Sequence, residues 1–252
     1  MPEGSLSALL LLADGRFPTG GHAHSGGFEP AAAVDGINDV PALEEFLRGR
    51  LGTAGLVSAA FAARACRMFR EYRRELHRKP GSGAAGTDSP ADPDAFDRTL
   101  ALLDIEFEAR TPSPVLRTVS RRLGRSLLRA GSAVWPEAGL GRLASAPGKG
   151  PHQPVALGAV AAAAGQSEQS TALIAAQESV AGPATAAIRL LGLDPFAVSA
   201  ALARLAPAIA ATAGEAAQYA SAAPADLPAR AGYLLDIFAE FHATWEVRLF
   251  AS

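Results

Sequence analysis

The sequence has very little cysteine and no surplus of charge of either sign. Its 252 residues include one cysteine, Cys66, which excludes an intrachain disulfide and a zinc site built from cysteines. The 23 basic and 25 acidic residues give a formal net charge of −2, so the bulk charge does not indicate nucleic acid as the partner. One cysteine also fits a reducing compartment, and we expect a cytoplasmic protein.

Long apolar runs of the kind that enter a membrane are also scarce. The opening run, LSALLLLAD, follows Glu3 where a signal peptide would carry a basic region, and Asp14 closes the run early. The apolar stretch Val155–Gly165 is too short to span a bilayer. We therefore expect a soluble protein with no signal peptide and no membrane partner.

Alternating β-branched residues, which would indicate strands, are missing, whereas alanine is abundant. Apolar residues instead recur at spacings of three and four, at Leu116, Val119, Leu123 and Leu127, and at Leu234, Phe238, Phe241, Trp245 and Leu249. With 49% hydrophobic residues the chain can bury a sizeable core. The sequence predicts one all-α, helical-bundle-like domain, residues 1–252, of about nine or ten helices.

Prolines mark where these helices should start and break. Short polar residues stand before proline ahead of three apolar-periodic runs, at Asp92-Pro93, Thr111-Pro112 and Asp194-Pro195, and each pair predicts a helix start. Pro183 and Pro207 lie inside periodic stretches and are expected to kink or divide their helices. Residues 80–93, PGSGAAGTDSPADP, lack an apolar anchor and predict an exposed, mobile loop.

Two histidines stand close together in the glycine-rich stretch FPTGGHAHSGGFEP, residues 17–30. His22 and His24 would lie on one side of an extended segment, so a shared metal ion is possible, and a metal-dependent hydrolase is the alternative function. The other histidines are scattered, and no HExxH motif supplies a third ligand. The opposing interpretation is a turn whose histidines bond to backbone. The glycines match no phosphate-binding loop, and no cofactor is predicted.

Arginines recur at spacings of three or four residues on two predicted helices. One stripe is Arg117, Arg121, Arg125 and Arg129, and the other is Arg67, Arg70, Arg74 and Arg78. Each stripe is either a solvated face with acidic neighbours or a docking surface for an acidic protein. Nucleic-acid binding through these stripes is a rival class, and it would show a steep dependence on salt.

The sequence FHATWEVRLFAS has an unusually apolar ending. Such an ending must either dock on its own domain or be buried by a partner. His242 and Glu246 stand one helical turn apart, so we expect them to form an ion pair.

Four segments, taken in order, resemble the UreF family of urease accessory proteins. They are LLLLADGRFPTGGHAHSGGFEPAAAVDG, RTPSPVLRTVSRRLGRSLL, GPHQPVALGAVAAAAG and the ending from His242 through Arg248, Leu249 and Phe250. The sequence departs from the family at His22-Ala23-His24, where many members have Phe-Ser-Tyr, at Leu193-Asp194-Pro195, and at Ala243, where a glutamate is usual.

The resemblance implies an all-helical, dimeric and non-catalytic scaffold. Such a protein binds the UreD/UreH accessory protein, recruits the GTPase UreG and helps to deliver nickel into apo-urease. An arginine of the Arg117–Arg129 stripe could modulate the GTPase, since arginine stabilises the charge of phosphoryl transfer.

We expect partner contacts on two faces of this scaffold. Trp245, Arg248, Leu249 and Phe250 would anchor UreD/UreH, and the turn Gly20-Gly21 with His22 and His24 would lie on a second face near the dimer axis. Other candidate contact residues are Ser25, Glu29, Arg117, Arg121, His242 and Glu246. Ser25 or His24 is expected to cap a helix beginning near Gly26, and Glu29 to favour the positive end of that helix.

Overall fold

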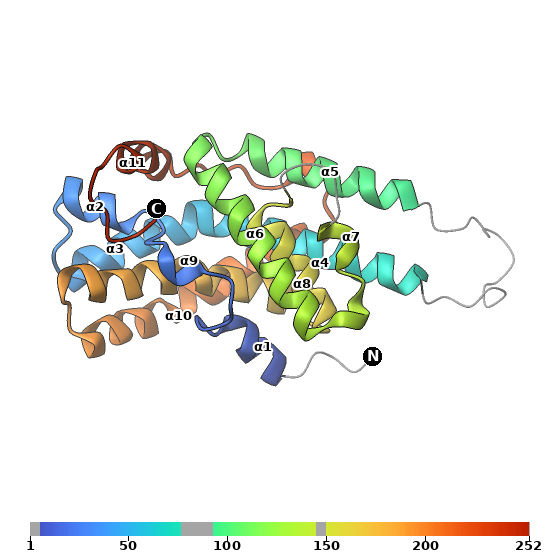
Figure 1. Ribbon diagram of the computed structural model, residues 1–252. Coiled ribbons are helices and arrows are strands. Elements are labelled where there is room, and N and C mark those ends of the chain that lie inside the picture. Colours follow the sequence, from blue (N-terminus) through green and yellow to red (C-terminus); the bar gives the residue numbers. More distant parts are fainter. Residues whose placement is uncertain (1–5, 77–92, 145–149, 252) are drawn as a thin grey trace, which may run out of the picture.

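The computed structural model describes residues 6–76, 93–144 and 150–251, and all regular structure in these ranges is helical. This confirms the all-α prediction. The helices are α1 Leu6–Ala13, α2 Phe28–Asp35, α3 Val40–Arg50, α4 Leu56–Leu76, α5 Pro93–Ala109, α6 Pro114–Val134, α7 Gly141–Ala144, α8 Gln153–Ala163, α9 Glu168–Leu191, α10 Pro195–Gln218 and α11 Tyr233–Ala243 (Figure 1). The loop expected at residues 80–93 falls outside the described residues up to position 92.

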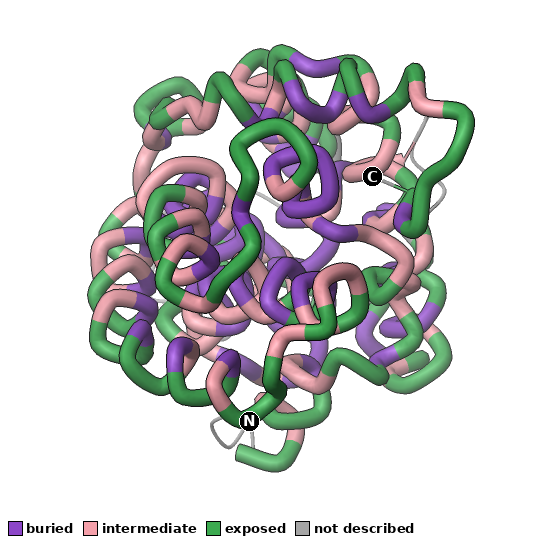
Figure 2. Tube along the Cα trace, turned by 90° about the vertical axis from the view of Figure 1, so that its left-hand side faces the viewer, coloured by how far each residue is buried: buried purple, intermediate pink, exposed green. Residues whose placement is uncertain are grey.

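The core is centred on α4 and α8, with α9, α10 and α6 packed around them. Helix α8 is apolar on every side, and its residues from Pro154 to Ala163 are all buried, as expected of a helix enclosed by others. Figure 2 looks along the long helices and shows their buried residues facing the centre of the bundle.

Gly158 lets α8 lie directly on α4. A Cβ atom at this position would lie 2.4 Å from the Ala62 carbonyl oxygen and 2.7 Å from the Cys66 backbone nitrogen. No side chain fits that distance, so the closest helix contact in the core depends on this glycine.

The predicted helix starts are partly confirmed. Pro93 begins α5, and the Asp194 carboxylate accepts hydrogen bonds from the N–H groups of Phe196 and Ala197 at the start of α10. The start expected at Thr111-Pro112 is wrong by two residues. Ser113 caps α6 instead, since its hydroxyl accepts from the Leu116 N–H at 3.1 Å.

Neither proline inside a long helix divides it. Helix α9 runs past Pro183, and α10 runs past Pro207. A proline removes one backbone hydrogen bond, and here the packing of α9 and α10 along the core offsets that loss.

A π-helical turn, Leu51–Gly55, joins α3 directly to α4. It leaves Arg50 facing α9, where its Nε donates to the Ser179 carbonyl oxygen at 2.9 Å. Within the described residues one helix, Pro195–Ser221, is long and apolar enough to cross a membrane by length and composition alone. This helix packs against α9, α4 and α3, which accounts for its apolar side in a folded domain.

Candidate functional site

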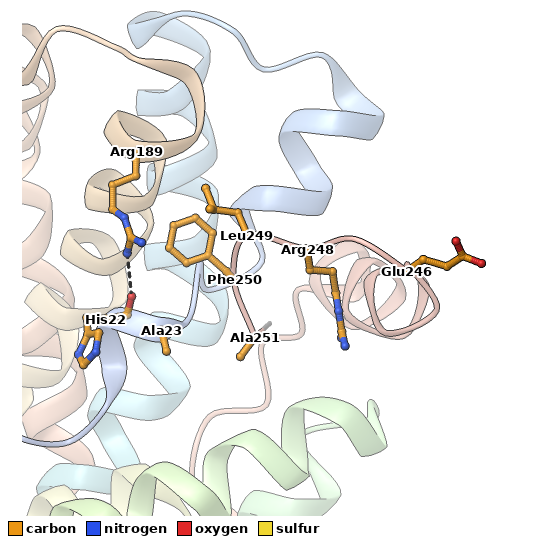
Figure 3. A pocket seen from close by; sticks show the side chains of 8 residues that line it. All are labelled: His22, Ala23, Arg189, Glu246, Arg248, Leu249, Phe250 and Ala251. Carbon is orange, nitrogen blue, oxygen red and sulfur yellow. Dashed lines mark hydrogen bonds between the residues drawn. The ribbon is translucent and has the colours of Figure 1, made fainter.

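The glycine-rich turn and the C-terminal segment meet at an open pocket of about 550 Å³. Its lining comes from the glycine-rich turn, from the last turn of α9 and from the residues that follow α11: His22, Ala23, Arg189, Glu246, Arg248, Leu249, Phe250 and Ala251 (Figure 3). The expectation that the turn and the C-terminal segment occupy separate faces is therefore wrong. The fold places them side by side.

Glycines shape the turn that carries His22 and His24. Gly26 and Gly27 have φ values of +62° and +87°, a region that side-chain-bearing residues rarely adopt. A Cβ atom on Gly26 would lie 3.0 Å from the Pro183 ring, so this turn lies directly against α9. The glycines thus allow a reversal of the chain and a close approach to α9 at the same point.

Ser25 performs the capping that the sequence predicted. Its hydroxyl accepts a hydrogen bond from the Glu29 N–H at 3.2 Å, in the first turn of α2. The N-cap position itself is Gly27, which offers no side chain. Helix α2 therefore begins at Phe28, two residues later than expected.

Glu29 has a larger role than favouring the positive end of α2. Its carboxylate is only 6% exposed and accepts hydrogen bonds from the Leu249 N–H at 2.8 Å and the Phe250 N–H at 3.0 Å. The His242 Nε2 lies 2.9 Å from the same carboxylate. Glu29 therefore joins the N-terminal turn to the C-terminal segment.

The predicted ion pair between His242 and Glu246 is wrong. Helix α11 ends at Ala243, so Glu246 is not one turn further along the same helix. His242 is 1% exposed, pairs with Glu29 and stacks edge-on against Trp245 with ring centroids 4.9 Å apart. Glu246 is exposed at the edge of the pocket.

The apolar chain ending is partly docked on its own domain and partly exposed. Phe250 is 4% exposed and lies under the Arg189 guanidinium, 4.9 Å from the ring centroid. The Ala251 N–H donates to the Ala23 carbonyl oxygen at 2.8 Å. Leu249, by contrast, is 52% exposed.

Helix α11 presents a further apolar surface beside this ending. Four large side chains on it are exposed: Tyr233, Leu234, Ile237 and Phe241. Together with Val247 and Leu249 they form what we call the C-terminal face. The sequence marked Leu234, Phe241 and Leu249 as one stripe with Phe238, but only Phe238 of these four packs into the core.

Arg189 connects both parts of the site, and the sequence analysis did not identify it. It lies in the last turn of α9, where its Nη1 donates to the His22 carbonyl oxygen at 3.2 Å while its guanidinium covers Phe250. A basic residue in a last helical turn is common, so its position alone gave no signal of this role.

The histidines of the turn show no metal site. Among the described residues, no group of three or more His, Cys, Asp or Glu side chains could hold a metal ion. Burial lowers the pKa of His24, and the nearby charges of Arg122 and His22 lower it further. Within the described residues, His22 and His24 therefore have no third side chain with which to hold the metal ion of a metal-dependent hydrolase.

Two arginines of the α6 stripe, Arg121 and Arg117, have acceptors within the fold. Arg121 is 14% exposed and donates to Asp104 at 2.7 Å, to the Gly150 carbonyl oxygen at 2.6 Å and to Glu108. The hydrogen bond from Arg121 to Glu108 is the main cause that lowers the pKa of the Glu108 carboxyl. Acceptors inside the chain thus already occupy the Arg121 guanidinium, and its contact with a partner stays a prediction.

Arg117 and the second stripe also have acceptors within the chain. Arg117 donates to the carbonyl oxygens of Thr111 and Pro112, at 2.9 and 2.8 Å. Arg67 pairs with Glu71, and Arg70 pairs with Glu168. The interpretation with acidic neighbours alongside thus fits these residues, whereas Arg78 falls outside the described residues.

Comparison with known proteins gives one consistent match. A model of the UreF family matches residues 37–206. Proteins named urease accessory protein UreF from Mycobacterium sp. strain JLS and from Mycolicibacterium vanbaalenii are 41% and 39% identical to this chain over 248 residues. Each alignment covers 98% of this chain and 99% of the relative. The similarity therefore extends beyond the matched region to the glycine-rich turn and the C-terminal face.

Proposed function

The chain belongs to the UreF family of urease accessory proteins, and from this premise we propose that it is a non-catalytic scaffold for urease maturation. It binds the UreD/UreH accessory protein, recruits the GTPase UreG and supports nickel insertion into apo-urease. We further propose that it works in the cytoplasm as a homodimer and needs no cofactor of its own.

The exposed C-terminal face is the observation that carries this proposal. Large apolar side chains on α11 and on the chain ending are exposed, and one of them, Leu249, lines the pocket. A contiguous exposed apolar surface is typical of a protein-binding site. Aromatic residues and arginine commonly dominate such interfaces, and Arg248 lies between Val247 and Leu249 in this face. We therefore assign UreD/UreH to the C-terminal face.

We place UreG recruitment at the neighbouring glycine-rich turn. His22 is exposed at the pocket that Arg189 and Arg248 also line. Polar and charged groups around an apolar contact usually form the rim of an interface and set its specificity. The two partners would then bind next to each other on one side of the scaffold.

Deletion of residues 243–252 tests the assignment of UreD/UreH. We expect the shortened chain to stay helical by circular dichroism and to lose co-purification with UreD/UreH. A double variant, Val247→Ser with Leu249→Ser, should weaken the complex while leaving Phe250 docked. The matched control is Phe196→Ser, which removes an exposed aromatic side chain on α10 and should change nothing. Undiminished co-purification of the shortened chain would refute the assignment.

Replacement of His22 and His24 by alanine tests the assignment of the turn. We expect less urease activation in cells that co-express the accessory proteins, with normal co-purification of UreD/UreH. Full urease activity would leave the turn with a structural role only.

A further inference from the structure

Glu29 is a buried carboxylate whose acceptors are satisfied by the far end of the chain. Its Oε1 accepts from Leu249, and its Oε2 accepts from Phe250 and lies within hydrogen-bond distance of His242. In the described part of the chain no arginine or lysine pairs with Glu29. A buried carboxylate needs hydrogen-bond donors, and those of Glu29 all come from His242, Leu249 and Phe250. The conformation of the C-terminal segment and the burial of Glu29 therefore depend on each other.

The segment that Glu29 holds has no helix of its own. Helix α11 ends at Ala243, and residues 244–251 contain only turns and bends. In Figure 3 the segment runs past the pocket with Arg248 and Glu246 directed outward and the Phe250 ring directed toward Arg189. Its other contacts are the burial of Phe250 beneath Arg189, the packing of Trp245 against His242 and Phe241, and the hydrogen bond from Ala251 to Ala23.

Glu29 forms hydrogen bonds on both sides of the exposed part of this segment. His242 precedes the segment, Leu249 and Phe250 lie near its end, and all three contact the same carboxylate. The intervening residues Val247 and Arg248 are exposed. A chain held at both ends has far fewer conformations than a loose ending, so its exposed side chains are ordered before a partner arrives.

We propose that Glu29 is a positioning residue for partner binding. It is buried and contacts no partner itself. It holds His242, Leu249 and Phe250 so that the exposed residues between them are presented in one conformation. This inference rests on the proposed function, since it concerns the surface assigned to UreD/UreH.

Two substitutions at Glu29 test this inference in the full-length chain. Glu29→Gln keeps the size of the side chain but replaces one acceptor oxygen with an amide donor, and Glu29→Ala removes both acceptors. The matched control is Glu45→Gln, which alters an exposed carboxylate on α3. Three measurements are made on each variant: hydrogen exchange of residues 244–251, affinity for purified UreD/UreH, and thermal unfolding by circular dichroism.

We expect faster exchange in residues 244–251 of both Glu29 variants, with unchanged exchange in α8 and α9. The affinity for UreD/UreH should fall by about tenfold or more in Glu29→Ala, and by less in Glu29→Gln, because binding must then order the segment. Glu45→Gln should match the unaltered chain in all three measurements. A general loss of stability would instead raise exchange throughout the core.

Other results would overturn the inference. One is a Glu29→Gln chain whose segment exchanges faster but which binds UreD/UreH as tightly as Glu45→Gln. Another is unchanged exchange in residues 244–251. If Glu29→Ala does not fold, Glu29→Gln alone decides. Tight binding by the chain that lacks residues 243–252 is a different outcome, since it refutes the assignment of UreD/UreH itself and the inference falls with it.

Discussion

Replacing Gly158 with alanine should strongly destabilise the fold, although alanine is the better helix former. The added Cβ would lie 2.4 Å from the Ala62 carbonyl oxygen, 2.6 Å from the Ala65 Cβ and 2.7 Å from the Cys66 backbone nitrogen. Two of these three atoms belong to the α4 backbone, which cannot rotate away. Overpacking of a core costs about 1–3 kcal/mol, and we expect the upper end here. Alanine regains about 1 kcal/mol of helix propensity, which leaves a net loss of about 2 kcal/mol.

Gly182→Ala is the matched control for this prediction. Gly182 is exposed inside α9, and an added Cβ would have no atom within 4 Å. This change should stabilise the fold by about 0.5–1 kcal/mol through helix propensity alone. Urea unfolding followed by circular dichroism measures both variants. Equal stability of the two variants would refute the argument that α4 and α8 need the glycine to touch.

Three further predictions concern buried polar and titratable groups. Arg121→Ala should lower the free energy of unfolding by about 2–4 kcal/mol, because the mostly buried Asp104 loses its charged partner and, among the described residues, keeps only the His152 N–H as a donor. Arg48→Ala on the surface should cost less than about 1 kcal/mol in the same urea titration. Burial raises the pKa of Glu178 to about 7 from 4.5, so the folded state holds its proton more tightly and the protein loses stability as pH rises from 4.5 to about 7. Glu178→Gln should remove that loss and be more stable than the original chain at pH 8, by up to about 3 kcal/mol, but not at pH 4. Burial also raises the pKa of Cys66 to about 12, so a thiol reagent at pH 8 should label it only after the protein is unfolded.

Each of these has a result that would contradict it. Equal costs for Arg121→Ala and Arg48→Ala would mean that the α5–α6 ion pairs add little. A Glu178→Gln chain with the same pH dependence as the original would place that carboxyl in water. Rapid labelling of Cys66 in the folded protein would mean that α4 and α8 open readily.

The helices could be predicted from the sequence because the signals for helix formation lie within a few residues of each other. Asp194 could be recognised as a cap since its carboxylate accepts hydrogen bonds from residues two and three positions later. The start of α6 was misplaced because Thr111-Pro112 and Ser113-Pro114 carry the same local signal. A residue distant in the sequence favours the second of these two starts. Glu240 on α11 accepts hydrogen bonds from the Val115 N–H at 3.0 Å and from the Ser113 hydroxyl.

The parts of the candidate site could be predicted, but their assembly could not. The sequence identified Glu29 and His242 separately, each by a rule about its own helix. Their contact joins residues 213 positions apart, and no spacing rule reaches across that distance. The rule that paired His242 with Glu246 assumed a helix that continues, whereas α11 ends one residue after His242.

Helix α9 explains how the two ends of the site come to lie together. The ring of Pro183 packs beneath Gly26, so a proline inside this helix supports the glycine-rich turn instead of dividing the helix. Two turns further along, Arg189 bonds to the turn through the His22 carbonyl oxygen and covers the Phe250 ring of the C-terminal segment. Because α9 contacts both segments, a partner that moved the C-terminal segment would change the contacts of Arg189 and of the Glu29 carboxylate. The two proposed partner sites are therefore mechanically joined, which is the arrangement that a scaffold needs if one partner's binding is to prepare the site for the next.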